Sequence, residues 1–197
     1  MANYISVTNN ILGSGFQINS RKLKKIVELL LRLFCFDETE VSISFVGKDT
    51  IKELNSTYRK INTPTDVLSF PQVEFNPPLS LIQKVSEARY PSTSLKEEKT
   101  RYNILGDIII CPEIAKKNVK KSGELSCEIA LLTIHSFLHL CGQDHLSKKE
   151  AEGMFTEQLL LLNLITTINT TPLWKDMVKI DTTKKQSFGK KKGQNKK

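Results

Sequence analysis

The spacing of hydrophobic and polar residues predicts a chain that mixes strands and helices. Short alternating or continuous apolar runs indicate four strands, at residues 4–8, 41–46, 67–70 and 104–110. Apolar residues at helical spacing indicate five helices, at residues 20–36, 49–58, 112–121, 125–141 and 147–165. This pattern predicts an α+β fold in which about five helices pack on a small four-stranded mixed sheet.

One predicted helix, at residues 125–141, is apolar on all sides, which implies that it is buried at the centre of the domain. Gly142 follows it and suits a left-handed helix end, and Ser147 is a suitable N-cap for the next helix. Residues 73–102 are rich in Pro, Ser, Lys and Glu and predict a long exposed excursion. Asp107 interrupts an apolar strand, and alternation leaves open whether it is buried and paired or faces away from the core.

All three histidines of the chain lie on this buried helix or in the turn after it, at His135, His139 and His145. The first two are four residues apart, so both imidazoles project from the same face of the helix. If the chain reverses at Gly142, His145 can face them. Three imidazoles around one point, with a fourth position open, are typical of a catalytic zinc site. The sequence therefore predicts one Zn²⁺ per chain rather than a purely structural histidine cluster.

The spacing H-x3-H-x2-G-x2-H also occurs in metzincin proteases, which carry a glutamate general base directly after the first histidine. Ser136 occupies that position here and cannot act as that base at neutral pH, so peptide hydrolysis is disfavoured. Asp144 is the only carboxylate inside the motif, and it either orients His145 or accepts a proton. Cys141 is a rival ligand that would close the metal site.

The formal net charge of +8 is concentrated at the end of the chain. Residues 184–197 contain seven lysines and no acidic residue, so the preceding domain, residues 1–183, is close to neutral. This composition predicts a disordered basic tail. The tail either solubilises the protein or grips a polyanion, and Lys190, Lys191 and Lys192 are its candidate RNA-binding residues.

Cysteine usage and the start of the chain bear on where the protein acts. The four cysteines are widely spaced and include no C-x2-C pair, which is typical of reduced thiols in a cytosolic protein. The first residues lack the basic start and apolar core of a secretory signal, and no apolar run reaches transmembrane length. We therefore expect a cytoplasmic protein with no membrane partner.

Three segments resemble the motif blocks of the YbeY family, the bacterial endoribonucleases and ribosomal RNA maturation factors. They are NSTYRKINTPTDVLSFP at residues 55–71, LGDIIIC at residues 105–111 and HSFLHLCGQDH at residues 135–145. The chain departs from the family pattern in the last block, where Ser136 replaces a glycine and Gln143 replaces an aromatic residue or histidine. Neither position is a ligand, although Ser136 adds bulk beside the first one.

The resemblance implies that zinc is held by His135, His139 and His145, and that the protein cleaves single-stranded RNA. It further implies a task in ribosomal RNA processing, including 16S 3′-end maturation, and in ribosome quality control, with the small ribosomal subunit as partner and no DNA substrate. The family's functional arginine falls on Arg59, and His135 and Arg59 are the expected catalytic residues. We expect the metal to activate a water while Arg59 stabilises charge on the phosphoryl oxygens. The alternative is a non-catalytic ribosome assembly factor with a structural zinc.

Overall fold

The structure is a computed structural model that describes residues 2–11, 14–83, 100–101, 104–119 and 124–181. Most of the predicted excursion and the whole of the predicted lysine tail, with Lys190, Lys191 and Lys192, lie outside the described residues.

The central element is a four-stranded mixed sheet, as the sequence predicts. Its strands are β1 (Tyr4–Asn9), β4 (Glu40–Phe45), β7 (Ile104–Ile110) and β5 (Val67–Pro71), in that spatial order. β1, β4 and β7 are parallel, whereas β5 pairs with β7 in the antiparallel sense. The prediction of a small mixed sheet is confirmed, and β7, its most apolar strand, has a partner on each side.

Two short strand pairs were not predicted. β2 (Phe16–Ile18) pairs with β8 (Val178–Ile180), and β3 (Phe36–Asp37) pairs with β6 (Thr100–Arg101). The first helix, α1 (Ser20–Leu33), correspondingly ends before the predicted residue 36. Cys35 follows it with a φ of 60°, a left-handed conformation that stops the helix and redirects the chain into β3. The prediction was wrong here because apolar residues at helical spacing continue past the point where the backbone turns.

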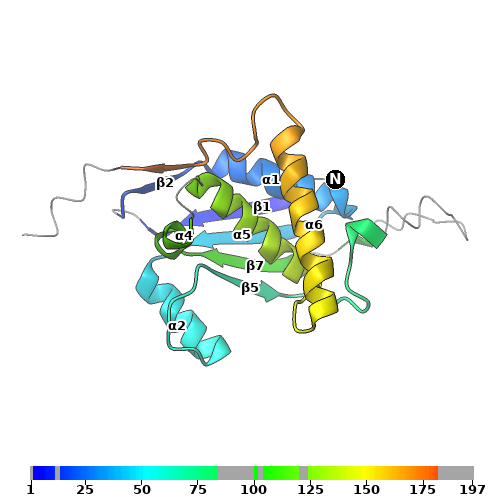
Figure 1. The fold of residues 1–197 in the computed structure, drawn as a ribbon, viewed down its shortest axis with the longest axis horizontal. Coiled ribbons are helices and arrows are strands. Elements are labelled where there is room, and N and C mark those ends of the chain that lie inside the picture. The colour runs from blue at the N-terminus through cyan, green and yellow to red at the C-terminus, as the bar shows by residue number, and fades with distance from the viewer. Residues whose placement is uncertain (1, 12–13, 84–99, 102–103, 120–123, 182–197) are drawn as a thin grey trace, which may run out of the picture.

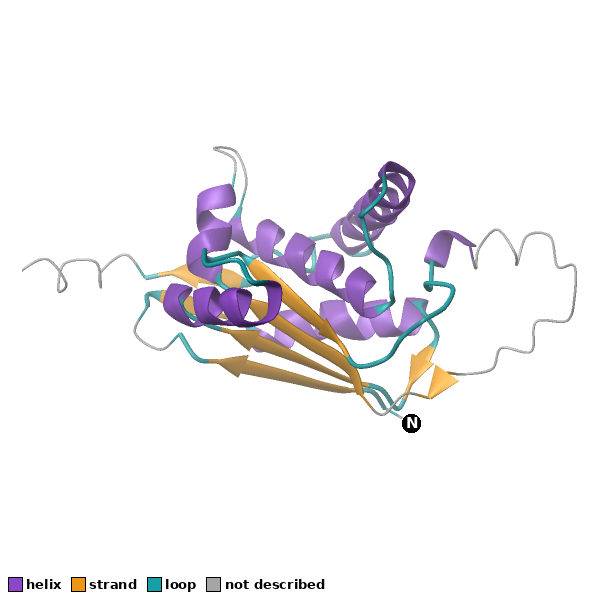
Figure 2. Ribbon diagram, turned by 90° about the horizontal axis from the view of Figure 1, so that it is seen from below, coloured by secondary structure: helices purple, strands orange, loops and turns teal. Residues whose placement is uncertain are grey.

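Further helices in the described part of the chain are α2 (Lys48–Arg59), α4 (Pro112–Asn118), α5 (Leu125–Leu140) and α6 (Lys148–Thr167), and residues 81–83 are also helical. Side chains cap the starts of α1 and α6, as the sequence predicts for Ser147, whereas α2 begins at Lys48 after Gly47 without a side-chain cap and not at the predicted residue 49. The side chain of Asn19 accepts a hydrogen bond from the amide of Lys22, and Ser147 forms a reciprocal capping box with Glu150. In the views of Figures 1 and 2, α1, α5 and α6 lie on one side of the sheet, with α6 crossing outside α5.

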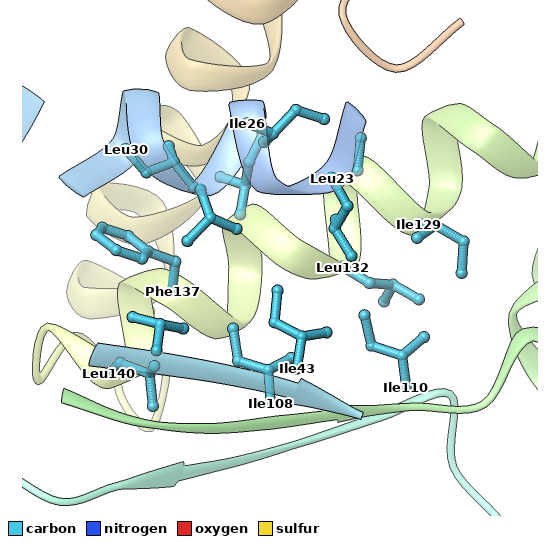
Figure 3. Packing of buried hydrophobic residues seen from close by; sticks show 14 of the residues in the cluster. Leu23, Ile26, Leu30, Ile43, Ile108, Ile110, Ile129, Leu132, Phe137 and Leu140 are labelled. Atoms are coloured by element: carbon cyan, nitrogen blue, oxygen red, sulfur yellow. The ribbon is translucent and has the colours of Figure 1, made fainter. Parts of the chain in front are cut away.

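Helix α5 lies at the centre of the hydrophobic core, which accounts for its apolar character on all sides (Figure 3). Its buried side chains pack between those of α1 and those of the sheet; the labelled members are Leu23, Ile26, Leu30, Ile43, Ile108, Ile110, Ile129, Leu132, Phe137 and Leu140. Because apolar side chains pack against α5 from both the sheet and α1, the helix is a rigid support for its partly exposed side chains.

Gly106 in β7 allows the end of α5 to come close to the sheet. A Cβ atom added there would lie 2.5 Å from the carbonyl oxygen of Phe70 and 2.7 Å from Cδ2 of Leu140, and the φ of Gly106 is 154°. Only glycine fits this conformation and this space. The C-terminal end of α5, which leads from His135 and His139 to the turn before His145, is therefore seated directly on β5 and β7.

Asp107, whose environment the sequence left open, is half-exposed. It is in register with Ser42 of β4 and Phe70 of β5, on the face of the sheet opposite the core residues Ile108 and Ile110. It is therefore not a buried, paired carboxylate. In the described part of the chain, no helix is both long enough and apolar enough to cross a membrane.

Candidate metal centre and adjoining cleft

The end of α5 is closed by the left-handed glycine that the sequence predicts. Gly142 has a φ of 83°, its amide donates to the carbonyl of His139 at 2.9 Å, and the amide of Gln143 donates to the carbonyl of Leu138 at 3.0 Å. These two bonds form a Schellman motif, which reverses the chain within three residues. His145 is thereby brought back beside the last turn of the helix.

The structure brings together the three histidines that the spacing predicts to converge. One ring nitrogen each of His135, His139 and His145 lies within 4.8 Å of the others. The rings of His135 and His139 are half-buried, whereas His145 is exposed. A group of this kind, open on one side, could hold a metal ion and leave room for a further ligand.

Hydrogen bonds on the far side of two rings point their metal-binding nitrogens at one another. Nδ1 of His139 donates to the carbonyl oxygen of Gln143 at 2.8 Å, and Nδ1 of His135 donates to Oε1 of Gln158 at 2.8 Å. The proton of each neutral ring is thus held on Nδ1, which leaves a lone pair on each Nε2.

The two Nε2 atoms are 3.2 Å apart. Two ligand nitrogens at Zn–N distances of about 2.0–2.1 Å in a tetrahedral arrangement would be about 3.3–3.4 Å apart. Two lone pairs at this separation repel each other unless a cation lies between them. The donor set, its tautomers and its spacing therefore all fit a metal ion such as zinc.

Burial keeps these imidazoles uncharged. Desolvation, reinforced by the neighbouring His135, lowers the pKa of His139 from 6.5 to about 4. Desolvation likewise lowers the pKa of His135. The neighbouring His145 and Arg59 act in the same direction, against the hydrogen bond to Gln158 and the charge of Asp66. Both rings are therefore neutral at physiological pH and ready to bind a metal without first losing a proton.

A cleft of about 590 Å³ opens beside the histidines. Its lining includes His139, Asp144 and the segment 71–75 that follows β5. Arg59, the last residue of α2, is exposed and lines the same cleft, so it shares one cavity with His139 although 80 residues separate them in sequence. An arginine facing a metal ion across a cleft of this size is suited to binding a phosphate group.

Asp144 lies at the side of the cluster. Its Oδ1 atom accepts a hydrogen bond from the backbone amide of His145 at 2.8 Å and lies 4.0 Å from Nδ1 of His139. This carboxylate fixes the backbone that leads into His145, and it adds a negative charge next to the histidines.

Helix α6 supplies two polar residues that the sequence analysis missed. Gln158 holds His135, and Glu157, which is almost fully buried, accepts hydrogen bonds from the hydroxyl of Ser80 and the amide of Leu81. The side chain of Gln143 links Glu157 at 3.1 Å to the carbonyl of Leu79 at 2.8 Å. A sequence signal existed, because Gln158 falls on the stripe of α6 whose other members are the buried Met154, Leu161 and Ile165.

Comparison with known proteins identifies the family of the chain. Residues 10–166 match the family model described as Endoribonuclease YbeY. The chain belongs to this family. It is 37% identical to the Endoribonuclease YbeY of Lachnoclostridium phytofermentans, over 77% of this chain and 91% of that protein. It is 40% identical to the Endoribonuclease YbeY of Corynebacterium efficiens, over 76% of this chain and 70% of that protein.

Among solved structures, the chain is similar to the solution structure of TM1509 from Thermotoga maritima. The TM-score is 0.49 and the sequence identity 26%, and the match covers 81% of this chain and 87% of that one.

Neither of the two side chains that depart from the YbeY motif is hydrogen-bonded to the histidine rings in the described residues. Ser136 is fully buried and is not among the residues that line the cleft, so its extra bulk lies in the core. Gln143 does line the cleft, but its side-chain amide donates to Glu157 and to the carbonyl of Leu79. Cys141, the rival ligand, is fully buried among core side chains, and the histidines alone form the group of potential ligands found in the described ranges.

Proposed function

We propose that this protein is a zinc-dependent, single-strand-specific endoribonuclease that acts in the cytoplasm on ribosomal RNA. The task would include 16S 3′-end maturation and ribosome quality control, with the small ribosomal subunit as the partner that presents the substrate. One observation supports the cleavage activity above others. In a chain of the YbeY family, three imidazoles, two of them kept neutral by burial, converge at the edge of a cleft that also contains an arginine.

Zinc bound at this site would supply a Lewis acid that lowers the pKa of water from about 15.7 toward 7 and polarises a phosphoryl oxygen. The protein contributes the positions. His135, His139 and His145 would hold the ion. The hydrogen bonds that Nδ1 of His135 and His139 donate to Gln158 and to the Gln143 carbonyl keep these two rings in the tautomer that can bind it.

Arg59 would act on the substrate from its place in the cleft. Its planar guanidinium can donate two hydrogen bonds to the non-bridging oxygens of the scissile phosphate and offset the charge that builds there during attack. Arg59 is the last residue of α2 and is exposed. Its guanidinium can therefore reach a phosphate without first breaking a buried ion pair. Asp144 would serve as a positioning residue for His145 through the bond to its backbone amide.

The alternative, an assembly factor with a structural zinc, needs a fourth protein ligand that closes the site. Cys141 was the best candidate for that ligand, and its place in the core argues against it. The catalytic proposal therefore has the better support.

The test is metal analysis of the purified protein together with cleavage of a structured ribosomal RNA fragment, with and without chelator. We expect bound zinc, and cuts in the unpaired regions that chelation abolishes. His139→Ala should lose both zinc and cleavage. Arg59→Ala should keep zinc but lose cleavage by roughly 10²–10³-fold, the usual cost of removing one transition-state donor.

Arg32→Ala is the matched control, because Arg32 is an exposed arginine on α1 that pairs with Glu28, outside the cleft. It should cleave like the wild type. Zinc binding without any RNA cleavage would favour the assembly factor, and full activity in Arg59→Ala would remove the role proposed for Arg59.

A further inference from the structure

A phenylalanine beside the metal centre is not explained by the fold. Phe155 on α6 is 45% exposed, although phenylalanine is usually buried. The residues of α6 that face the core are Met154, Leu161 and Ile165, together with Glu157 and Gln158, and Phe155 lies outside that set.

The ring of Phe155 stacks alongside the histidines. Its centroid is 6.0 Å from that of His145 with 16° between the ring planes, and 6.5 Å from that of His135 with 15° between the planes. The rings of His135 and His145 are themselves 27° from parallel, at a centroid distance of 5.6 Å. Three nearly parallel rings thus lie at the metal centre, and Phe155 is the one without a role in holding an ion.

From this arrangement we infer that Phe155 is a stacking platform for the base of a nucleotide next to the scissile phosphate. The inference deepens the proposed function and rests on it. A phosphate bound between the zinc site and Arg59 would bring its neighbouring bases close to the histidine cluster. Phe155 is not among the residues that line the cleft, but its ring lies at that cluster, 6.0 Å from the ring of His145. An exposed aromatic face binds a base of any sequence, with a typical gain of about 1–3 kcal/mol per base.

The same geometry gives a physical reason for single-strand selectivity. In an RNA duplex, each base is stacked and paired inside the helix and cannot turn a face toward a side chain outside it. A base in a loop or an unpaired end can do so without first breaking a pair. Phe155 would therefore favour cleavage next to unpaired nucleotides and contribute nothing to the binding of a duplex.

The experiment compares wild type, Phe155→Ala and Phe155→Trp in the zinc-loaded full chain. The substrates are a single-stranded RNA oligonucleotide with a mapped cleavage site and derivatives that lack one base on either side of it. Phe155→Ala should retain zinc and lower kcat/KM on the intact oligonucleotide by about 5- to 150-fold, which corresponds to the stacking gain of one base. Phe155→Trp should restore the rate, because it keeps an aromatic face.

The decisive readout is the coupling between side chain and base. Removing the base that stacks on Phe155 should slow cleavage by the wild type by a similar factor. It should not slow Phe155→Ala further, since this variant already lacks the ring on which the base stacks. If Phe155 has only a structural role, the loss in rate caused by Phe155→Ala and the loss caused by the missing base should multiply. The matched control is Leu160→Ala, a truncation on the same helix of a side chain that is 48% exposed, and it should behave like wild type.

The inference is overturned if kcat/KM is unchanged in Phe155→Ala, or if Leu160→Ala loses as much kcat/KM as Phe155→Ala. It is also overturned if Phe155→Ala loses zinc, or if its loss in rate multiplies with that of the missing base at every abasic position. A defect of Phe155→Ala that appears only on whole ribosomal subunits would assign the ring to a protein contact and would also overturn it. If the wild type cuts no RNA, the proposed function itself fails. If it cuts RNA and Phe155→Ala does so equally well, only the platform fails.

Discussion

The hydrogen bond that His135 donates to Gln158 of α6 should raise the zinc affinity of the metal centre, and replacing Gln158 tests this. Replacing Gln158 by alanine removes the acceptor that lies 2.8 Å from Nδ1 of His135, in a position where the glutamine is only 9% exposed. The imidazole then keeps a half-buried N–H without a protein partner, and its proton is no longer held on Nδ1. Part of the metal-free protein then carries the proton on Nε2 of His135, and this tautomer must convert before the ring can bind the metal.

Two independent estimates of the cost agree. A buried polar group that loses its partner typically costs about 1–3 kcal/mol. Removing the hydrogen-bond partner of a metal-bound histidine typically lowers metal affinity about 10- to 100-fold, or about 1.4–2.8 kcal/mol. We therefore expect Gln158→Ala to bind zinc about 10- to 100-fold more weakly than the wild type.

The assay is competition for zinc with a chromophoric chelator at neutral pH, with circular dichroism to show that the variant is folded. Gln158→Glu is the matched control, because its carboxylate can accept the same bond and makes the imidazole a stronger ligand. Its zinc affinity should equal or exceed that of the wild type. The reasoning is refuted if Gln158→Ala binds zinc within twofold of the wild type, or if the glutamate variant loses as much as the alanine variant.

Three further predictions concern stability and the tail. The pKa of His139 falls from 6.5 in the unfolded chain to about 4 in the folded protein, so the unfolded state binds more protons between these values. The stability of the metal-free protein therefore decreases as the pH is lowered through this range. The free energy of unfolding should drop by about 2 kcal/mol more between pH 7.5 and 5 in the wild type than in His139→Asn, measured by urea denaturation, and equal drops would contradict the shift. Ser136→Ala should raise stability by about 1–3 kcal/mol without changing zinc affinity, because the described residues offer the buried hydroxyl of Ser136 no hydrogen-bond partner; a loss of stability in a thermal melt would show that the hydroxyl is satisfied. Deleting the residues after Thr183 should weaken RNA binding measured with chelator present and should flatten its salt dependence by about 0.7 in log–log slope per lost phosphate contact, whereas an unchanged slope would exclude the tail from binding.

The parts of the protein that were predictable are those governed by short-range geometry. His135 and His139 share a face because a helical turn spans about 3.6 residues, and Gly142 reverses the chain because it adopts a positive φ without strain. The four strands of the main sheet and the capped helix starts follow equally local patterns. The short pair of β3 and β6 escaped prediction, since two residues carry no periodic pattern.

What the sequence by itself determined is therefore the ligand set and the turn that closes it, since both depend on residues within eleven positions of one another. Only the tertiary structure decided which groups surround that set. Arg59 reaches the cleft from α2, Gln158 and Phe155 reach the histidines from α6, and Asp107 turns away from the core. These placements depend on how each helix is rotated and seated on the sheet, which the packing of many distant side chains settles together. A pattern read along one segment contains no information about that rotation relative to another.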